Sequence, residues 1–400
     1  MKADLTACFM STPMPNPFIL ASAPPTRNME MVSRAFHEGW GGAVIKTMSQ
    51  YTGDGDQALK DVSPRIFPLR VGSKFNGFNF GFMNIELGSQ ETHEQYCENI
   101  VKLKREWPDR AVIASILYGS TPIKEKWCDA ARDCERAGAD ALELNFSCPH
   151  GCSEIGSGAS IGENPQKIME ILGWMKEATK LPLMVKLTAM SDIVYSSVIC
   201  EENGANAICA INTVSAVPGI DISTFKPIFN VNGVGTSSGI SGRVIRPIAL
   251  RSVMEIARRV NIPISGCGGI YDWKDTAEFI LAGASTVQIC SAVMENGYGI
   301  IKNLTSGLQN YMENMGFANI DSFRGRVLNN IIPHAEIDRK TRVHPTWSKT
   351  HCVYCAKCVA TCRDAGYQAI SVDQGEIRID LAKCSGCGLC MGLCPNDCLK

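Results

Sequence analysis

The chain has 400 residues, of which 45% are hydrophobic and 20% are charged. That balance is ordinary for a globular protein, and the length predicts one large domain with a smaller one, or two domains. A formal net charge of −1 gives no electrostatic reason to expect nucleic acid or an anionic membrane as a partner, and no apolar run approaches the roughly 20 residues that span a bilayer.

The N-terminal segment, "MKADLTACFMSTPMPNPFIL", carries too little charge and too many prolines for a signal peptide. We therefore expect a cytoplasmic protein. The 19 cysteines then indicate metal ligation or catalysis rather than disulfide bonds, because disulfides belong to secreted chains.

Eight apolar runs alternate with helical patterns along the first 320 residues, which is typical of buried parallel strands. The runs are 18–23, 42–47, 111–117, 139–147, 181–187, 206–213, 262–268 and 285–293. Glycine closes three of the intervening helices in similar turns, "AGAD" at 137, "NGAN" at 203 and "AGAS" at 282. The pattern predicts an α/β fold, a (β/α)8 TIM barrel over residues 1–320. A doubly wound sheet is the alternative, but no G-x-G-x-x-G follows the first strand.

Chemistry in such barrels lies at the carboxyl ends of the strands. The polar residues expected there are Lys46, Thr47, Asn145, Ser147, Cys148, Lys186, Asn212, Thr213, Cys290 and Ser291. The glycine-rich "GCGGI" at 266–270 leaves bare backbone after the seventh strand, where barrels commonly bind a phosphate. A phosphate-bearing cofactor is expected. The C-terminal cysteine runs, Cys352 to Cys362 and Cys384 to Cys394, predict iron–sulfur clusters, and beside such clusters a flavin fits best, since it converts single electrons into a hydride.

The stretch "LELNFSCPHGCSEIGSG" at 142–158 raises a separate question. Cys148, His150 and Cys152 allow a metal site, a structural pair or a catalytic thiol. A metal site needs a fourth ligand nearby. The place of Cys148 at the end of a strand favours a catalytic thiol, with Cys152 as a loop residue.

Nine cysteines lie between 352 and 398, and eight of them form two C-x2-C-x2-C-x3-C runs. This spacing is that of bacterial ferredoxins with two [4Fe–4S] clusters, in which the fourth cysteine of each run binds the other cluster. The expected ligand sets are Cys352, Cys355, Cys358 and Cys394, and Cys384, Cys387, Cys390 and Cys362. Zinc knuckles are the alternative, but they do not need the third cysteine of each run. Cys398 is left over as a buried spectator. We expect a ferredoxin-like α+β domain at 344–400, after a linker at 321–343.

With these residues identified, the chain resembles the dihydropyrimidine dehydrogenases and, more distantly, the class 1 dihydroorotate dehydrogenases. It looks most similar to the bacterial catalytic-subunit type, which pairs an FMN barrel with a two-cluster ferredoxin domain. The resemblance rests on "NIEL" (84–87), "LELNFSCPHG" (142–151), "INTVS" (211–215), "SGISGRVIRPIALR" (238–251), "CSAV" (290–293) and "GYQAI" (366–370).

The resemblance implies a role for each matching position. The implied substrate contacts are Asn84, Glu86, Asn145, Ser147, Asn212 and Thr213, and Cys148 matches the catalytic cysteine. The implied FMN contacts are Ala21, Ser22, Lys46, Thr47, Asn145, Lys186, Ser241, Gly242, Gly268, Gly269, Cys290 and Ser291. Amide side chains suit the alternating C=O and N–H groups of a pyrimidine.

The sequence departs from the family pattern at two positions. Gly88 replaces a bulkier apolar residue and Phe146 replaces leucine, and both are expected near the substrate. His150 follows "SCP" where dihydroorotate dehydrogenases have asparagine, which favours an uncharged pyrimidine.

The expected activity is reversible reduction of the 5,6 double bond of uracil or thymine, with a thiol as proton donor. The FAD and NADPH-binding half of the animal enzymes is absent, so a separate flavoprotein subunit that uses NAD(P)H is expected as partner, in a homodimer or heterotetramer. Two enzyme alternatives remain open: a reductase of another unsaturated cyclic amide and a dihydroorotate dehydrogenase-like enzyme. An electron-transfer module with a degenerate barrel is the alternative of another class.

Overall fold

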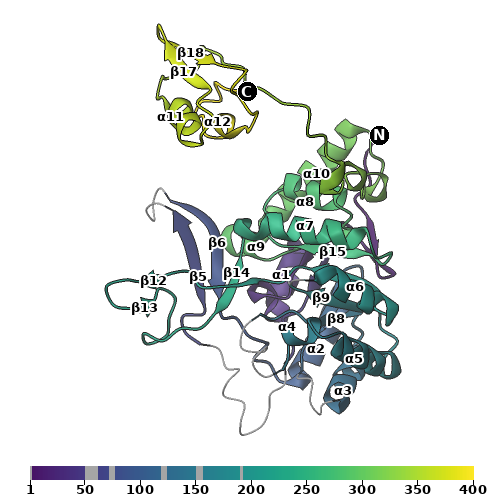
Figure 1. Ribbon diagram of the computed structural model, residues 1–400. Helices are drawn as coiled ribbons and strands as arrows, with labels where there is room; N and C mark the ends of the chain where they lie inside the picture. Colours follow the sequence, from purple (N-terminus) through teal and green to yellow (C-terminus); the bar gives the residue numbers. More distant parts are fainter. Residues whose placement is uncertain (1, 50–61, 72–76, 119–123, 150–155, 190–191) are drawn as a thin grey trace. The chain divides into compact units, whose positions relative to one another are not determined.

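Eight parallel strands close into a barrel in the order β3-β4-β7-β8-β9-β10-β15-β16, and β16 pairs back onto β3. Figure 1 shows the helices and strands of the chain. The structure is a computed structural model that describes residues 2–49, 62–71, 77–118, 124–149, 156–189 and 192–400. The barrel strands are β3 (Phe18–Leu20), β4 (Gly42–Val44), β7 (Ala111–Ile116), β8 (Ala141–Asn145), β9 (Leu183–Leu187), β10 (Ala207–Ala210), β15 (Ile264–Cys267) and β16 (Thr286–Ile289). Each of the eight runs expected from the sequence contains one of them, so the predicted barrel is confirmed.

A helix follows each barrel strand. These helices are α1 (Met29–Glu38), α2 (His93–Glu106), α3 (Lys124–Arg136), α5 (Pro165–Ala178), α6 (Ile193–Glu202), α7 (Arg246–Ala257), α8 (Trp273–Leu281) and α10 (Ile301–Met315). The short helices α4 (Ala159–Gly162) and α9 (Ser291–Asn296) precede α5 and α10. The side chains of Asn28 and Thr92 accept hydrogen bonds from backbone N–H groups in the first turns of α1 and α2, which satisfies donors that a helix start leaves unpaired.

The three similar helix-to-strand turns are formed as the sequence predicts. Gly138, Gly204 and Gly283 have φ values of +87°, +96° and +111°, a conformation that side chains with a Cβ rarely adopt. Each glycine ends its helix so that the next barrel strand begins within a few residues.

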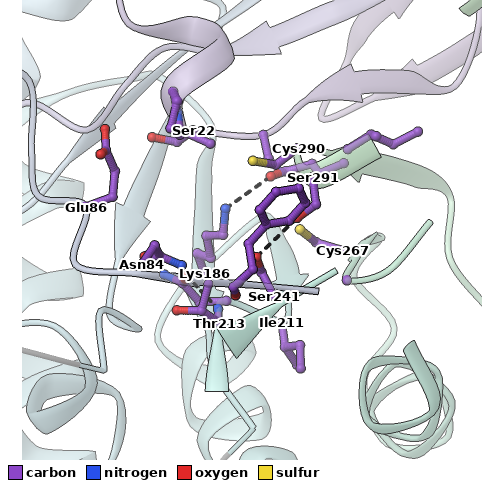
Figure 2. A pocket seen from close by; sticks show the side chains of 18 of the residues that line it. Ser22, Asn84, Glu86, Lys186, Ile211, Thr213, Ser241, Cys267, Cys290 and Ser291 are labelled. Atoms are coloured by element: carbon purple, nitrogen blue, oxygen red, sulfur yellow. Dashed lines mark hydrogen bonds between the residues drawn. The ribbon is translucent and has the colours of Figure 1, made fainter. Parts of the chain in front are cut away.

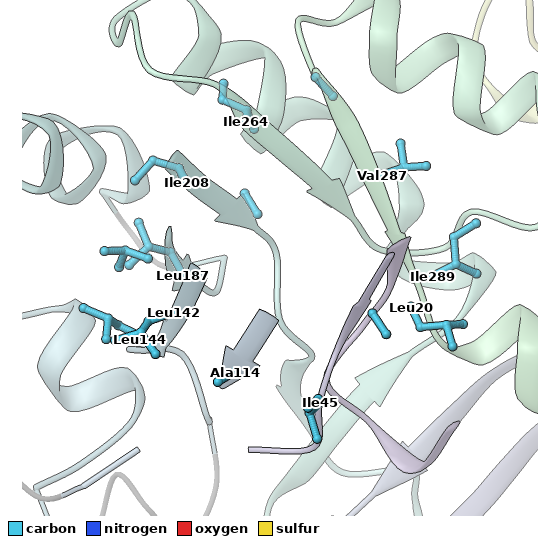
Figure 3. Packing of buried hydrophobic residues seen from close by; sticks show 14 of the residues in the cluster. Leu20, Ile45, Ala114, Leu142, Leu144, Leu187, Ile208, Ile264, Val287 and Ile289 are labelled. Carbon is cyan, nitrogen blue, oxygen red and sulfur yellow. The ribbon is translucent and has the colours of Figure 1, made fainter. Parts of the chain in front are cut away.

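Barrel strands are buried along their whole length, which explains why their sequences are continuously apolar. Their outward side chains, such as Leu142, Leu187, Ile208 and Val287, belong to one large cluster with the helices (Figure 3). Burying a side chain of this size stabilises a fold by roughly 1.5–3 kcal/mol. The barrel layer therefore gives the strand ends a rigid support.

A hairpin packs into the core at the start of the strands. It consists of β1 (Ala7–Phe9) and β2 (Thr12–Met14). Phe9 and Met14 are almost fully buried in one cluster with Ile19, Met184 and Cys209 of the barrel interior. The hairpin thus covers apolar side chains inside the barrel.

A four-stranded antiparallel sheet, absent from our expectations, is inserted after two barrel strands. In the order β11-β14-β6-β5 it pairs β5 (Ile66–Val71) and β6 (Phe78–Asn84), inserted after β4, with β11 (Val214–Ala216) and β14 (Ser238–Ser241), inserted after β10. A two-stranded ribbon of β12 (Ile220–Asp221) and β13 (Lys226–Pro227) lies between β11 and β14 in sequence. The sequence signal that could have indicated β6 is the phenylalanine at every second position from 78 to 82, which is typical of a strand.

The chain divides into a unit of residues 1–329 and a unit of residues 330–400. The division between the units falls within the expected linker at 321–343. Residues 321–329 pack with the barrel unit: Phe323 is fully buried and the Gly325 N–H donates to the Ile280 carbonyl. The second unit contains α11 (Lys357–Asp364), a hairpin of β17 (Ile370–Asp373) and β18 (Glu376–Ile379), and α12 (Leu389–Gly392). In the described residues no helix has the length and apolar character needed to cross a membrane.

Candidate active site

A cleft with about 1090 Å³ of empty space opens at the carboxyl ends of the barrel strands and extends along β5, β6 and β14. All residues expected to contact the cofactor line it, namely Ala21, Ser22, Lys46, Thr47, Asn145, Lys186, Ser241, Gly242, Gly268, Gly269, Cys290 and Ser291. So do Asn84, Glu86, Asn212, Thr213 and the thiol-bearing Cys148. Figure 2 shows many of these side chains directed into one space.

A chain of hydrogen bonds connects residues at the ends of β3, β4, β8 and β10 at the floor of the cleft. The Ser22 hydroxyl lies 3.0 Å from the Thr47 hydroxyl, which accepts from the Asn145 amide at 3.3 Å. Ser147 donates to the Asn145 oxygen at 2.7 Å and accepts from the Asn212 amide at 2.8 Å. These bonds fix the orientation of both amides before any ligand binds.

Ser147 is therefore placed differently from the expectation that it contacts substrate. Its side chain is fully buried and is not part of the cleft wall, and both hydrogen bonds go to asparagines that do line the cleft. In this structure Ser147 holds Asn145 and Asn212 in position.

Phe146 requires a clear correction. We expected it near the substrate, but its ring is fully buried in the layer between barrel and helices, edge-on to Trp127 with 6.0 Å between the ring centroids. Side chains alternate sides along an extended strand, so Asn145 faces the cleft and Phe146 faces the helices. The phenylalanine changes core packing rather than the cleft.

Glu86 lies at the centre of a cluster of cations. Its Oε1 is 2.8 Å from Arg27 Nη2 and 3.3 Å from Lys46 Nζ, and its Oε2 is 2.8 Å from Arg65 Nε. Burial opposes ionisation of this carboxyl, but Lys46, Arg27 and Arg65 outweigh it, so the pKa of Glu86 lies below its ordinary value. Glu86 thus presents an ionised carboxylate to the cleft, which only accepts hydrogen bonds. Neither arginine was identified from the sequence.

At the opposite end of the cleft, packing and backbone conformation require two glycines, which leave bare backbone at the cleft wall. A Cβ on Gly268 would lie 2.7 Å from the Ala249 Cβ, and one on Gly269 would lie 2.8 Å from the Gly242 carbonyl, and both glycines have positive φ. The Ser291 hydroxyl donates to the Ser241 hydroxyl at 3.1 Å beside them. Bare backbone and paired hydroxyls next to the start of α9 are groups that would hold a phosphate.

Three thiols of the described residues line the cleft, and they lie at the ends of different strands. Cys267 ends β15, Cys290 directly follows β16, and Cys148 follows β8 beside Asn145. Burial raises the pKa of Cys290 to about 12, which keeps that thiol protonated. Cys148 is 9% exposed, packs against Leu117, and is backed by Gly158, where a Cβ would lie 2.6 Å from the Cys148 carbonyl. Cys148 is thus held on the side of the cleft that carries the amides. His150 and Cys152 lie outside the described residues, so a metal site there is not tested.

Gly88 lines the cleft, and its close neighbours explain why this position is occupied by glycine. A Cβ at this position would overlap the Ser49 hydroxyl and lie 3.1 Å from the Thr47 carbonyl, which already accepts from the Ser89 N–H at 2.7 Å. The segment around Gly88 is therefore clamped against the segment that follows β4.

This contact predicts the effect of adding a side chain at Gly88. Gly88→Ala should destabilise the fold by about 1–3 kcal/mol, since overpacking forces the backbone to shift. Removing the Ser49 hydroxyl relieves part of the overlap, so Gly88→Ala combined with Ser49→Ala should be more stable than Gly88→Ala alone. Urea unfolding of the single and double variants measures both effects. Equal stability of wild type and Gly88→Ala would contradict the observed packing.

In the C-terminal unit the cysteines surround two separate cavities. One is lined by Cys352, Cys355, Cys358 and Cys394, and the other by Cys362, Cys384, Cys387 and Cys390. Each cavity thus combines three thiols of one sequence run with the fourth thiol of the other run, a donor set that fits a [4Fe–4S] cluster. Cys398 is buried, as expected, but it also lines the first cavity, and its N–H donates to the Cys394 sulfur at 3.2 Å.

The sequence of the barrel matches the dihydroorotate dehydrogenase family over residues 4–312. The chain belongs to this family. Residues 347–400 match the 4Fe-4S dicluster domain. The barrel of this dihydroorotate dehydrogenase family member therefore carries a two-cluster electron-transfer domain on the same chain.

Three relatives cover most of this chain. The NAD-dependent dihydropyrimidine dehydrogenase subunit PreA of Escherichia coli K12 is 35% identical over 406 residues, which cover 100% of this chain and 96% of the relative. The chloroplastic dihydropyrimidine dehydrogenase (NADP(+)) of Arabidopsis thaliana is 37% identical over 350 residues, 85% of this chain and 81% of the relative. The catalytic subunit of dihydroorotate dehydrogenase B (NAD(+)) of Pyrococcus horikoshii is 36% identical over 314 residues, 78% of this chain and 94% of the relative.

These matches confirm the family that the sequence motifs indicated. The chain is a flavin oxidoreductase of the dihydropyrimidine and dihydroorotate dehydrogenase type, with a [4Fe–4S] dicluster domain. Both kinds of relative occur at nearly equal identity, so the substrate must be argued from the cleft itself.

Proposed function

We propose that the chain catalyses reversible reduction of the 5,6 double bond of uracil or thymine. FMN would occupy the cleft between the glycine-rich end and Lys46. Two [4Fe–4S] clusters would relay electrons from a flavoprotein subunit that oxidises NAD(P)H. The relatives named as subunits support the expectation of such a partner. A homodimer or heterotetramer is the corresponding assembly.

The observation that carries this proposal is a set of oriented amides beside a buried thiol. Asn84 donates to the Gly239 carbonyl at 3.0 Å, and Asn145 and Asn212 are both fixed through Ser147. Each amide keeps further donor and acceptor capacity for the C=O and N–H groups of a pyrimidine ring. A site of this kind discriminates strongly against rings that leave its amides unpaired.

Charge pairing supports an uncharged ring over one that carries a carboxylate. Both lysines that line the described cleft contact a carboxylate: Lys46 lies 3.3 Å from Glu86, and Lys186 lies 3.6 Å from Glu143. Capturing an anionic substituent with either lysine would compete with these pairs. Uracil and thymine carry no anionic substituent, so their binding leaves both lysine–carboxylate pairs intact.

The residues divide the chemistry between the two faces of the substrate ring. FMN bound in the cleft would supply or accept the hydride at C6. The Cys148 thiol gives the proton to C5 during reduction and takes it back during oxidation, as a general acid and base. Asn84, Asn145, Asn212 and Thr213 hold the ring, and ionised Glu86 accepts a hydrogen bond from a ring N–H.

Anaerobic titration of the purified chain tests the proposal. Dihydrouracil or dihydrothymine should bleach the flavin absorbance and support reduction of an artificial electron acceptor, whereas dihydroorotate should do neither. NADH and NADPH should leave the flavin oxidised without the partner, because the sequence has no dinucleotide-binding fingerprint. Bleaching of the flavin by NADH or NADPH without the partner would contradict the proposal that a separate flavoprotein subunit oxidises the nicotinamide.

The same titration separates the competing functions. Bleaching by dihydroorotate alone would establish the dihydroorotate dehydrogenase-like alternative, which the relative from Pyrococcus horikoshii keeps open. Response to neither kind of ring, with FMN bound, would favour another unsaturated cyclic amide. Purified protein without FMN, but with its clusters, would indicate an electron-transfer module with a degenerate barrel.

A further inference from the structure

A carboxylate is buried inside the barrel directly below the cleft. Glu143 of β8 is fully buried, and its Oε2 accepts from the Gln288 amide of β16 at 3.0 Å. Its Oε1 lies 3.6 Å from the Lys186 ammonium of β9 and accepts from the Ser115 hydroxyl of β7 at 3.5 Å. Four strands thus each contribute one polar side chain to a closed group, and the sequence had indicated only Lys186.

Lys186 connects this buried group to the cleft. Lys186 and Gln288 both line the cleft, whereas Glu143 lies beneath them and does not. The ammonium of Lys186, which is labelled in Figure 2, donates to the Gln288 oxygen at 3.3 Å, so the amide bridges the two charges. Any ligand ring on the cleft floor therefore meets the ammonium, with the carboxylate behind it.

The protonation of Lys186 depends on that carboxylate. Burial alone would lower the pKa of a lysine, but Glu143 reverses the effect and the pKa of Lys186 lies above its ordinary value. The other groups that face Lys186 are Cys209 on β10, Cys267 on β15 and Cys290 after β16. Lys46 shows the contrast: it also has a carboxylate partner, yet burial leaves its pKa below the ordinary value.

We propose that Glu143 is a positioning residue that keeps Lys186 protonated in both oxidation states of the bound flavin. This inference rests on the proposed FMN site. With Lys186 already charged, two-electron reduction takes up one proton, which goes to the flavin ring and leaves it anionic beside the ammonium. Without Glu143, a neutral Lys186 would take up a second proton on reduction, because the anionic ring then pairs with the ammonium. The carboxylate thus sets the number of protons that accompany the two electrons.

The dependence of the flavin midpoint potential on pH measures this number directly. The experiment uses the full-length chain with FMN bound, dithionite as reductant, redox dyes and flavin absorbance, from neutral to alkaline pH. In the wild type, the midpoint potential should fall with rising pH at the slope that corresponds to uptake of one proton per two electrons. Glu143→Gln keeps the size of the side chain, its oxygen can still accept from the Gln288 amide, and its NH2 can donate to the Ser115 hydroxyl. The slope of this variant should be twice as steep.

Variants of Lys186 provide the matched controls. Glu143→Gln with Lys186→Arg should return to the wild-type slope, because a guanidinium does not lose its proton. Glu143→Gln with Lys186→Met should do the same, since no titrating group remains, and it removes both buried charges together. If Glu143→Gln does not fold, Glu143→Asp serves instead: it draws the carboxylate back by one methylene, and the slope should steepen only at the alkaline end.

The possible outcomes distinguish a failure of the role proposed for Glu143 from a failure of the proposed function. A wild-type slope in Glu143→Gln with FMN bound would overturn the role of Glu143 and leave the proposed function intact. A steep slope that persists in Glu143→Gln with Lys186→Arg would also overturn it, because the second proton would then belong to another group. Absence of FMN from purified wild-type protein would overturn the proposed function itself, and the inference with it.

Discussion

The Cys148→Ala variant should bind the pyrimidine but reduce it very slowly, because the proton for C5 no longer has a positioned donor. The substitution removes the thiol and leaves Asn84, Asn145, Asn212 and Thr213 in place, so affinity for the substrate should change little. Loss of a positioned acid or base typically lowers the rate by about 10² to 10⁴. Single-turnover reoxidation of reduced flavin by uracil measures the step directly, and equilibrium binding to the oxidised enzyme measures the affinity.

Two further variants make the assignment of Cys148 specific. Cys148→Ser keeps a proton but is a weaker acid, so reduction of uracil should be slow, with its optimum at higher pH. Cys152→Ala, at a position outside the described residues, should stay close to wild type. Normal turnover of Cys148→Ala together with an inactive Cys152→Ala would make Cys152 the acid and refute the assignment.

Pairs of cysteine substitutions should reveal which thiols share a cluster. The intact chain is expected to hold about eight irons, and loss of one cluster should leave about four. Cys355 and Cys394 line the same cavity although they belong to different sequence runs, whereas Cys355 and Cys362 share a run but line different cavities. Cys355→Ser with Cys394→Ser should therefore lose one cluster, and Cys355→Ser with Cys362→Ser should lose both.

Iron content and acid-labile sulfide per chain measure the outcome, and FMN content serves as the control for an intact barrel. Cys398→Ser is the matched single variant, because it lines the first cavity without being an expected ligand, and it should keep both clusters. The opposite pattern in the two double variants would show that each run holds its own cluster. Stoichiometric zinc with little iron would show that the two cavities bind zinc rather than [4Fe–4S] clusters.

The barrel could be predicted from the sequence because each strand and each turn is marked by a pattern within a few consecutive residues. Each strand is continuously apolar, and the turns at Gly138, Gly204 and Gly283 require a residue that adopts positive φ. The cysteine spacing in the C-terminal unit is equally local. Such features depend on a few neighbouring residues, so one sequence is enough to recognise them.

The features that the sequence did not reveal depend on contacts between distant segments. Glu143 reads as one polar residue in an apolar strand, and its partners Ser115 and Gln288 come from other strands. Arg27 and Arg65 approach Glu86 from separate loops. Phe146 was misplaced because the family pattern gives its position but not the side of the strand that it faces. The packing of 321–329 onto the barrel likewise depends on distant residues such as Ile280.

The inserted sheet has a consequence for how the active site assembles during folding. Asn84 at the end of β6 bonds to Gly239 of β14, 155 residues along the chain, and the strands between them include four of the barrel. Closing so long a loop costs entropy that the intervening structure must first offset. The wall that carries Asn84 and Glu86 is therefore expected to form late, after the floor with Asn145 and Lys186. Folding intermediates of this chain would contain the sequence-adjacent strands β7 to β10 without the wall that recognises the substrate.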